Sequence, residues 1–265
     1  MWAIVVALNQ PERTRKTISD LLAQSEKPRV LLLAQGVDWN FRGQIESWAE
    51  EDKRILPWFH DPPLPSLSAS WNRALRFCWA LGEGVALVCN NDIELREDTL
   101  LWLSMTMQEE EALFVSAVGV DQVGWGDRLV EVLEEPSAMK GGPDFSCFLI
   151  SQECHTKFPF DEAFIPAYTE DCDLHRRVML AGEGQRMFSI NVPYLHHASG
   201  TLKEMPEERA QAIKAMIHTV ARAHYKAKWG GDVNQEKFKV PFGPEEVEGV
   251  TTAELFHAER ELWTR

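Results

Sequence analysis

An acidic run at residues 160–177 constrains this chain more than any other segment. It reads FDEAFIPAYTEDCDLHRR, and apolar residues recur at helical spacing in its second half. Thr169 is positioned to cap a helix that begins after it. Glu170 and Asp171 then fall in the first turn, where the helix dipole favours ionised carboxylates. The run therefore predicts either an ordinary capped helix or an aspartate positioned to take a proton from a hydroxyl group.

The composition indicates a globular protein with a substantial core. The chain has 265 residues, a hydrophobic fraction of 45% and ten tryptophans, which suits one large domain or one domain with an appendage. Residues 1–8 resemble a signal core, but no basic stretch precedes them and no small-residue cleavage site follows. No apolar run approaches the length of a membrane span. The sequence predicts a soluble, cytoplasmic protein whose residues 2–8 form a buried strand.

The cysteine content and the net charge limit the cellular compartments and the binding partners that the sequence predicts. Five cysteines without regular spacing suit reduced thiols in a reducing compartment. The formal charge of −14 argues against non-specific binding to nucleic acid or to anionic membranes. Residues 203–239 are locally basic, which indicates either a solvated helix face or a docking surface for an anionic partner.

The order of strand-like and helical patterns predicts an α/β fold with a mainly parallel sheet. We expect strands at residues 2–8, 29–33, 84–89, 113–120, 145–150 and 190–195. We expect helices from Pro11, over 44–51, from about Ser68, after a capping Asp98, after Thr169 and over 206–228, with a short final helix in the tail. Residues 55–66 are rich in proline and read as a connection.

A polar motif follows one of the buried strands. Asn90, Asn91 and Asp92 come at the carboxyl end of the strand predicted over 84–89, which is where open α/β sheets bind ligands. Asp92, with Asn90 or Glu94, offers hard oxygen ligands to Mg²⁺ or Mn²⁺. The same motif also forms common turns, so both interpretations stay open.

His196 and His197 form the only adjacent histidine pair, directly after a predicted strand. Such a pair is either structural, or one imidazole completes a Mn²⁺ site. The cysteines and histidines elsewhere match no regular zinc-ligand spacing. There is no Walker loop, nucleophile elbow or dinucleotide fingerprint. Carboxylates, histidines and a divalent cation remain as the chemistry that the sequence supports.

Taken in order, these motifs resemble the GT-A fold glycosyltransferases of family 2, the inverting group that includes bacterial rhamnosyltransferases. The resemblance covers roughly residues 2–201 and rests on segments 5–9, 70–72, 90–92, 145–151, 160–173 and 196–201. It implies a Rossmann-like, three-layer α/β sandwich. It also implies a GT-A catalytic domain over 1–202 and a C-terminal helical extension over 203–265 packed on it.

The family pattern carries roles onto matching positions. Asp171 matches the general base, beside Glu170, and Asp92 with His196 or His197 matches the site for Mn²⁺ or Mg²⁺, His196 being the favoured ligand. The resemblance implies donor-binding roles for Ala7, Asn9, Arg13, Gln35, Asn72, Asn90, Asn91 and Arg177. Ala34 and Gln35 stand where family members usually carry an Asp or Asn that contacts the base. The nucleobase is therefore left open.

The implied reaction moves a sugar from a nucleotide diphosphate donor, a UDP- or dTDP-sugar, to an acceptor hydroxyl. Residues 225–243 also resemble the ending of small phage and bacterial glycosyltransferases. The acceptor is thus either a bacterial glycan or a hydroxymethylated pyrimidine in phage DNA. We expect residues 121–143 and 203–265 to select it. The sequence gives no indication of the oligomeric state.

Two other function classes remain open. A sugar nucleotidyltransferase shares the architecture and the metal requirement, but residues 9–13 are not the Gly-rich basic loop that binds a triphosphate. A non-catalytic nucleotide-sugar or glycan-binding module is favoured by Ala34 and Asn90. The presence of Asp92 and Asp171 opposes it.

Overall fold

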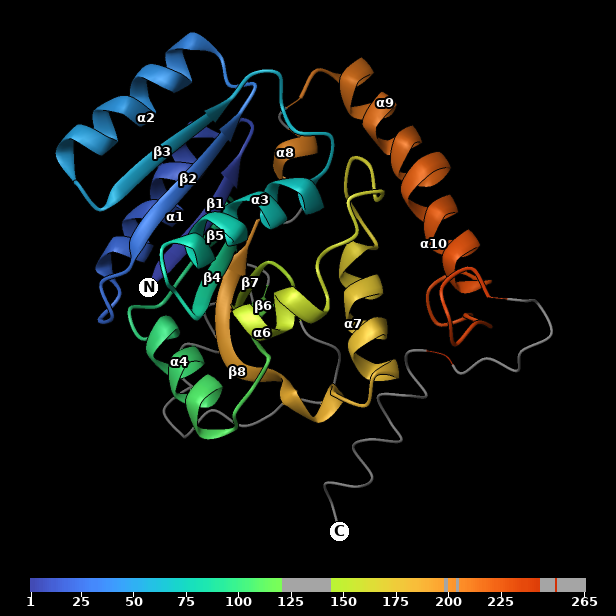
Figure 1. Cartoon of the computed structure of the whole chain (residues 1–265). Helices are drawn as coiled ribbons and strands as arrows, with labels where there is room; N and C mark the ends of the chain where they lie inside the picture. Colours follow the sequence, from blue (N-terminus) through green and yellow to red (C-terminus); the bar gives the residue numbers. More distant parts are fainter. Residues whose placement is uncertain (121–143, 198–199, 204, 244–250, 252–265) are drawn as a thin grey trace.

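The structure, a computed structural model, describes residues 1–120, 144–197, 200–203, 205–243 and 251. One eight-stranded sheet runs through it in the order β3-β2-β1-β4-β7-β6-β8-β5 (Figure 1). Its first half is parallel and is built from β1 (Trp2–Ala7), β2 (Arg29–Gln35), β3 (Ile55–His60) and β4 (Val85–Asn90). These strands begin and end close to the limits that the sequence patterns predict, β3 excepted.

The second half of the sheet mixes strand directions. Strand β7 (Cys147–Ser151) pairs antiparallel with β4 and with β6 (Phe114–Val120). Strand β8 (Met187–His196) runs parallel to β6, and the short β5 (Ile93–Glu94) pairs antiparallel with the end of β8. The predicted α/β class with a mainly parallel sheet is confirmed.

The sheet is buried on both faces, as the alternation along β1 shows. Val5 and Ala7 point into one core, which also holds side chains of α1, α2 and α4. Ile4 and Val6 point into the other, which holds side chains of α3 and α7. Period-two alternation with no polar face requires a helical layer on each side of the sheet. The predicted three-layer sandwich follows from this pattern.

The helices connect the strands and extend beyond them. Before β7 they are α1 (Pro11–Ala23), α2 (Trp39–Glu51), α3 (Leu67–Ala80) and α4 (Thr99–Glu109). After β7 come α6 (Gln152–Lys157), α7 (Glu170–Leu180), the 3₁₀ turn Gly184–Arg186 and α8 (Gly200–Lys203). The long C-terminal helix is α9 (Glu207–Met216), a π segment (Ile217–Ala221) and α10 (Arg222–Trp229). No helix of the described residues has the length and hydropathy of a membrane span.

Three local expectations are wrong. Residues 55–60 form strand β3 and not a connection, because β3 is the edge of the sheet and an edge strand tolerates Pro57. Asp98 begins α4 without a side-chain cap, since its carboxylate accepts hydrogen bonds from Arg96 and Trp102. Thr169 does not cap α7 with its side chain either. The expected final helix lies outside the described residues.

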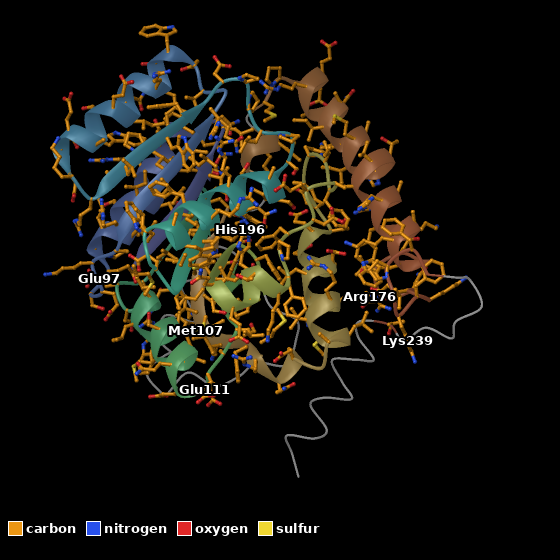
Figure 2. The ribbon with its side chains drawn as sticks, viewed as in Figure 1. Glu97, Met107, Glu111, Arg176, His196 and Lys239 are labelled. Carbon is orange, nitrogen blue, oxygen red and sulfur yellow. The ribbon has the colours of Figure 1, made fainter. Side chains whose placement is uncertain are left out.

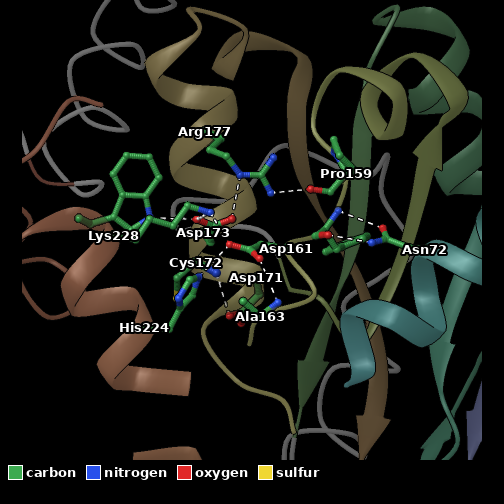
Figure 3. Close-up of polar contacts among 12 residues, drawn as sticks. Asn72, Pro159, Asp161, Ala163, Asp171, Cys172, Asp173, Arg177, His224 and Lys228 are labelled. Carbon is green, nitrogen blue, oxygen red and sulfur yellow. Dashed lines mark hydrogen bonds and ion pairs between the residues drawn. The ribbon is translucent and has the colours of Figure 1, made fainter. Parts of the chain in front are cut away.

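A buried cluster fastens the C-terminal helix to α7. Lys228 on α10 is 7% exposed, and its Nζ lies 2.7 Å from Asp161 Oδ2 and 2.7 Å from Asp173 Oδ1. His224 Nε2 lies 2.9 Å from Asp161 Oδ2 (Figure 3). Although burial opposes it, hydrogen bonds from Lys228 and His224 lower the pKa of Asp161. Lys228 thus neutralises two carboxylates that lie at opposite ends of the acidic run.

The residues that follow α10 pack back against α7 and α10. Arg176, which is labelled in Figure 2, is fully buried, lies over the Trp229 ring at 4.9 Å and donates to the Phe238 carbonyl oxygen at 2.6 Å. Tyr225 Oη donates to Glu236 Oε1 at 2.5 Å. Residues 221–238 therefore pack on α7. The division into domains at residue 202 stays a prediction.

We expect Lys228→Met to lower the free energy of unfolding by about 3 kcal/mol, because it leaves the carboxylates of Asp161 and Asp173 without their buried cation. Urea unfolding followed by circular dichroism measures the loss. Lys226→Met is the matched control, because Lys226 lies on the same helix and forms an exposed ion pair with Asp232 at 3.4 Å. That control should cost less than about 1 kcal/mol. Equal losses in the two variants would contradict the role of Lys228.

Candidate functional site

The pairing of two strand ends brings the Asn-Asn-Asp motif to the histidine pair. Ile93 of β5 faces His196 of β8 in the antiparallel register. The His197 backbone N–H donates to the Asp92 carbonyl oxygen at 3.1 Å. As a result His196 Nε2 lies 3.6 Å from Asp92 Oδ1. Two segments from opposite halves of the chain therefore share one edge of the sheet.

Asn91 ties this edge to the first loop of the chain. Its Nδ2 donates to the Asn9 carbonyl oxygen at 3.1 Å and to Thr14 Oγ1 at 2.9 Å. The loop passes into α1 through Gln10, whose φ of 65° is left-handed. The Asn91 amide thus holds the turn from β1 to α1 against the end of β4.

One pocket of about 710 Å³ collects the polar residues of the candidate site. Its wall includes Asn90, Asn91 and Asp92 at the end of β4, and His196 at the end of β8. Glu170 and Asp171 reach it from the first turn of α7. The three motifs singled out in the sequence therefore meet in one cavity.

The turn before α7 directs the carboxylates of Glu170 and Asp171 into the pocket. Tyr168 and Thr169 both have left-handed backbones, with φ of 78° and 69°. Instead of capping the helix, Thr169 Oγ1 donates to the Tyr168 carbonyl oxygen at 2.6 Å. Asp171 Oδ1 accepts a hydrogen bond from the Cys172 backbone N–H at 2.8 Å. The turn is thus closed by its own polar groups.

Burial opposes the ionisation of both carboxyl groups. Glu170 is 4% exposed, and burial together with the charge of Asp171 raises its pKa to about 8. Burial also raises the pKa of Asp171, against the hydrogen bond from Cys172 and with the charge of Asp144. Desolvation therefore outweighs the helix dipole that the sequence led us to consider. Both groups hold protons more strongly than exposed carboxylates do.

The pocket is acidic and lacks counterions of its own. Asp92, Asp144, Glu170 and Asp171 line it, and the described lining contains no lysine or arginine. A diphosphate entering such a wall is repelled unless a cation accompanies it. The charge pattern thus favours a ligand that arrives with a divalent metal ion.

Asp92 and His196 fit such a cation. Carboxylate oxygen and imidazole nitrogen suit Mn²⁺, and a carboxylate suits Mg²⁺. No group of three or more His, Cys, Asp or Glu side chains gathers as a metal cage anywhere in the described residues. Mg²⁺ in particular usually takes few protein ligands and completes its shell with water and phosphate oxygens. The pair therefore fits a metal that binds together with a diphosphate.

The side chains of His197 and Arg177 lie outside the described lining of the pocket. His197 Nε2 lies 2.9 Å from Glu94 Oε1, and this imidazole does not line the pocket. Arg177 Nε donates to Asp173 Oδ2 at 2.8 Å, and its Nη2 donates to the Pro159 carbonyl oxygen at 2.8 Å. Figure 3 shows this guanidinium between α7 and residues 159–161. Arg177 thus joins α7 to the segment at Pro159 and is not part of the described pocket lining.

Two polar residues support the pocket from behind or within its wall. Asn72 is buried outside the lining, where its Nδ2 donates to the Phe160 carbonyl oxygen at 2.7 Å and its Oδ1 accepts from the Phe160 N–H at 3.0 Å. Gln35 does line the pocket, but its amide is engaged by Ser70 Oγ at 2.6 Å and by the Leu64 N–H at 2.8 Å. The Asn72 amide therefore holds the backbone at Phe160, and the Gln35 amide joins the Ser70 side chain to the backbone at Leu64.

The remaining candidates lie near the pocket without lining it. Ala7 is buried at the end of β1, whereas its near neighbours Val6 and Leu8 do form part of the wall. Asn9 contributes its backbone oxygen to Asn91, and Arg13 lies partly buried on α1. None of these three side chains belongs to the described lining.

Several residues that line the pocket were not predicted from the sequence. Asp144 is held by the Gly119 N–H at 3.1 Å and by the Ser146 N–H at 2.9 Å, and it faces the same cavity. The only sequence feature that could have indicated Asp144 as a pocket residue is its position directly before the predicted strand at 145–150. Leu202, Met205 and Ile213 also line the pocket, and the last two belong to residues 203–265, which we expect to select the acceptor.

No family model and no curated protein matches the sequence. Solved structures of other proteins do match the structure of this chain. The chain is similar to the mannosyltransferase PcManGT from Pyrobaculum calidifontis, solved with GDP-Man and Mn²⁺, at a TM-score of 0.58 and 12% identity over 100% of this chain and 80% of that one. It is similar to TarS from S. aureus at a TM-score of 0.56 and 13% identity, over 85% of this chain and 71% of that one.

It is also similar to glucosyl-3-phosphoglycerate synthase from Mycobacterium tuberculosis at a TM-score of 0.55 and 14% identity, over 82% of this chain and 76% of that one. One structure of that enzyme holds Mn²⁺, UDP and glucosyl-3-phosphoglycerate. At these identities the likeness concerns the fold. The chain has the GT-A fold of nucleotide-sugar glycosyltransferases.

Proposed function

We propose that this protein is a metal-dependent, inverting glycosyltransferase that moves a sugar from a nucleotide diphosphate to an acceptor hydroxyl. One observation carries the proposal: Asp92, His196 and Asp171 line a single pocket although they come from three separate segments. The structural neighbours support it, since they include enzymes solved with GDP-Man or UDP together with Mn²⁺. A UDP- or dTDP-sugar is the proposed donor.

Asp92 and His196 would hold Mn²⁺ or Mg²⁺ at the donor diphosphate. When bound, such a cation neutralises the charge that develops on the leaving nucleoside diphosphate. The chain supplies a rigid edge for it, because the β5–β8 pairing fixes both residues. Asn90 lies beside them in the wall with an amide suited to hydrogen-bond the donor.

Asp171 would act as the general base. Its carboxylate accepts the proton of the acceptor hydroxyl, the acceptor oxygen bonds to the anomeric carbon, and the bond from that carbon to the diphosphate oxygen breaks. Attack opposite the leaving group inverts the configuration. Burial raises the pKa of Asp171, which makes its carboxylate a stronger base than an exposed one.

Glu170 would work as a positioning group beside this base. Its Oε2 is buried and has no hydrogen-bond partner among the described residues. With a pKa of about 8 the carboxyl group is protonated at neutral pH and donates a hydrogen bond. A substrate hydroxyl in the pocket would satisfy it.

Asp171→Asn should keep donor binding and lose transfer by about two orders of magnitude or more, since the amide cannot take the proton. Initial rates with a nucleotide sugar that the wild type turns over measure the loss. Calorimetric titration with UDP and Mn²⁺ measures binding in the same variant. Near-normal transfer would remove Asp171 from the role of base.

The adjacent histidines give a matched test of the metal site. His196→Ala should weaken Mn²⁺ binding in the presence of UDP by about tenfold or more, because one ligand is lost. His197→Ala should bind Mn²⁺ like the wild type, because its imidazole pairs with Glu94 outside the pocket. The free Mn²⁺ signal in electron paramagnetic resonance measures both. Equal losses in the two variants would argue against His196 as the ligand.

Glu170 predicts how stability depends on pH. A carboxyl group with a folded-state pKa of about 8 and an ordinary value of 4.5 binds more protons in the folded state. The free energy of unfolding should therefore fall as pH rises through that window, by up to about 1.4 kcal/mol per pH unit. Glu170→Gln should resemble the wild type at pH 5 and exceed its stability at pH 8.

Denaturant unfolding at both pH values measures the difference. Glu12→Gln, an exposed substitution on α1, should keep the wild-type dependence. A Glu170→Gln variant with an unchanged slope would mean that Glu170 ionises normally in the folded protein.

A further inference from the structure

Part of the pocket wall is chemically unlike the acidic edge. We call this part the apolar rim; it consists of Leu64, Leu67, Pro166, Tyr168, Met205 and Ile213. These residues come from the end of the connection between β3 and α3 with the first residue of α3, from the turn before α7, and from α9 with Met205, which lies two residues before that helix. Figure 1 shows the three segments approaching one another above α3 and α7. The rim contains no charged side chain.

Tyr168 is the residue of the apolar rim that stands out. It is 44% exposed, although it lines the pocket, and its φ of 78° is left-handed. A bulky residue is strained in that region, where glycine would not be. Strained residues persist where the surrounding structure holds them, and they concentrate at ligand-binding positions. Here the left-handed residue is an aromatic one that lines the pocket, two residues before Glu170.

We propose that the apolar rim is the acceptor subsite and that the acceptor is a neutral glycan, one sugar ring of which stacks on Tyr168. This rests on the proposed glycosyltransferase function. A sugar ring combines a face of C–H groups with an edge of hydroxyls. The face packs on an aromatic ring, which supplies large contact area at low entropic cost. A hydroxyl on the edge then reaches Asp171.

The charges around the pocket argue for a neutral acceptor. Asp92, Asp144 and Asp171 line the cavity beside the protonated Glu170, and no lysine or arginine does so among the described residues. A polyanion such as DNA is recognised mainly through cations at its phosphates. Lys228, one of the basic residues of the C-terminal region, is already held by Asp161 and Asp173. The described wall therefore offers a polyanionic acceptor repulsion and no compensating contact.

The test uses the full chain with Mn²⁺, a nucleotide sugar that the wild type hydrolyses, and 4-nitrophenyl glycosides as neutral acceptors. Tyr168→Ala should raise the KM for the glycoside about tenfold, the size expected for one lost aromatic contact. The KM for the donor and its hydrolysis without acceptor should stay at wild-type values. Saturation-transfer NMR of the glycoside should lose its signal in the same variant, independently of turnover.

Three further variants keep the result interpretable. Tyr168→Phe retains the ring and should retain the wild-type KM. Tyr168→Gly relieves the left-handed backbone, so it should not lower the melting temperature while it raises the KM for the glycoside. Trp39→Ala removes an aromatic ring that is 86% exposed on α2, outside the pocket, and should change nothing.

The outcomes distinguish a failure of the proposed glycosyltransferase function from a failure of the acceptor inference alone. A wild type that hydrolyses no nucleotide sugar overturns the proposed function, and the acceptor inference falls with it. A wild-type KM for the glycoside in Tyr168→Ala overturns the acceptor inference alone. So does transfer to duplex DNA containing 5-hydroxymethylcytosine in place of the glycosides.

Discussion

The candidate site depends on the pairing of a two-residue strand. Strand β5 holds the Asn-Asn-Asp motif against the end of β8, with Ile93 facing His196. Thr17 on α1 secures β5 from behind, because its Oγ1 lies 2.6 Å from the Ile93 carbonyl oxygen and 3.3 Å from the Ile93 nitrogen. A slip of one residue in this pairing would reverse the side chains of β5. Asp92 would then leave the position beside His196.

The acidic helix α7 serves two environments at once. Glu170 and Asp171 face the pocket, where burial raises the pKa of each. Asp173 is buried and faces the other way, where Lys228 and Arg177 neutralise it. At about 100° per residue, two or three positions along a helix suffice for this separation. The C-terminal extension thus offsets part of the electrostatic cost of an acidic helix, while the pocket keeps carboxylates without cations.

Local sequence patterns predicted what depends on local physics. Hydrophobic periodicity located most strands and helices, and the order of the motifs indicated that Asp92, His196 and Asp171 share a cavity, as they do. The pattern missed β3, because Pro57 reads as a breaker unless the strand is known to be an edge. It also could not tell that Arg177 would pair with Asp173 and Pro159, since a charged side chain chooses its partner only after packing. Tertiary contacts decide such roles.

Charge links the two halves of the proposed reaction. The carboxylate of Asp144 lies in the same wall and adds to the raised pKa of Asp171, so it strengthens the proposed base. The same negative charges disfavour any anion that arrives without a cation. A donor diphosphate can bring its own metal ion, whereas an acceptor approaching over Tyr168 and Met205 meets apolar surface. A strong base in an acidic pocket and a neutral acceptor are therefore two consequences of one charge distribution.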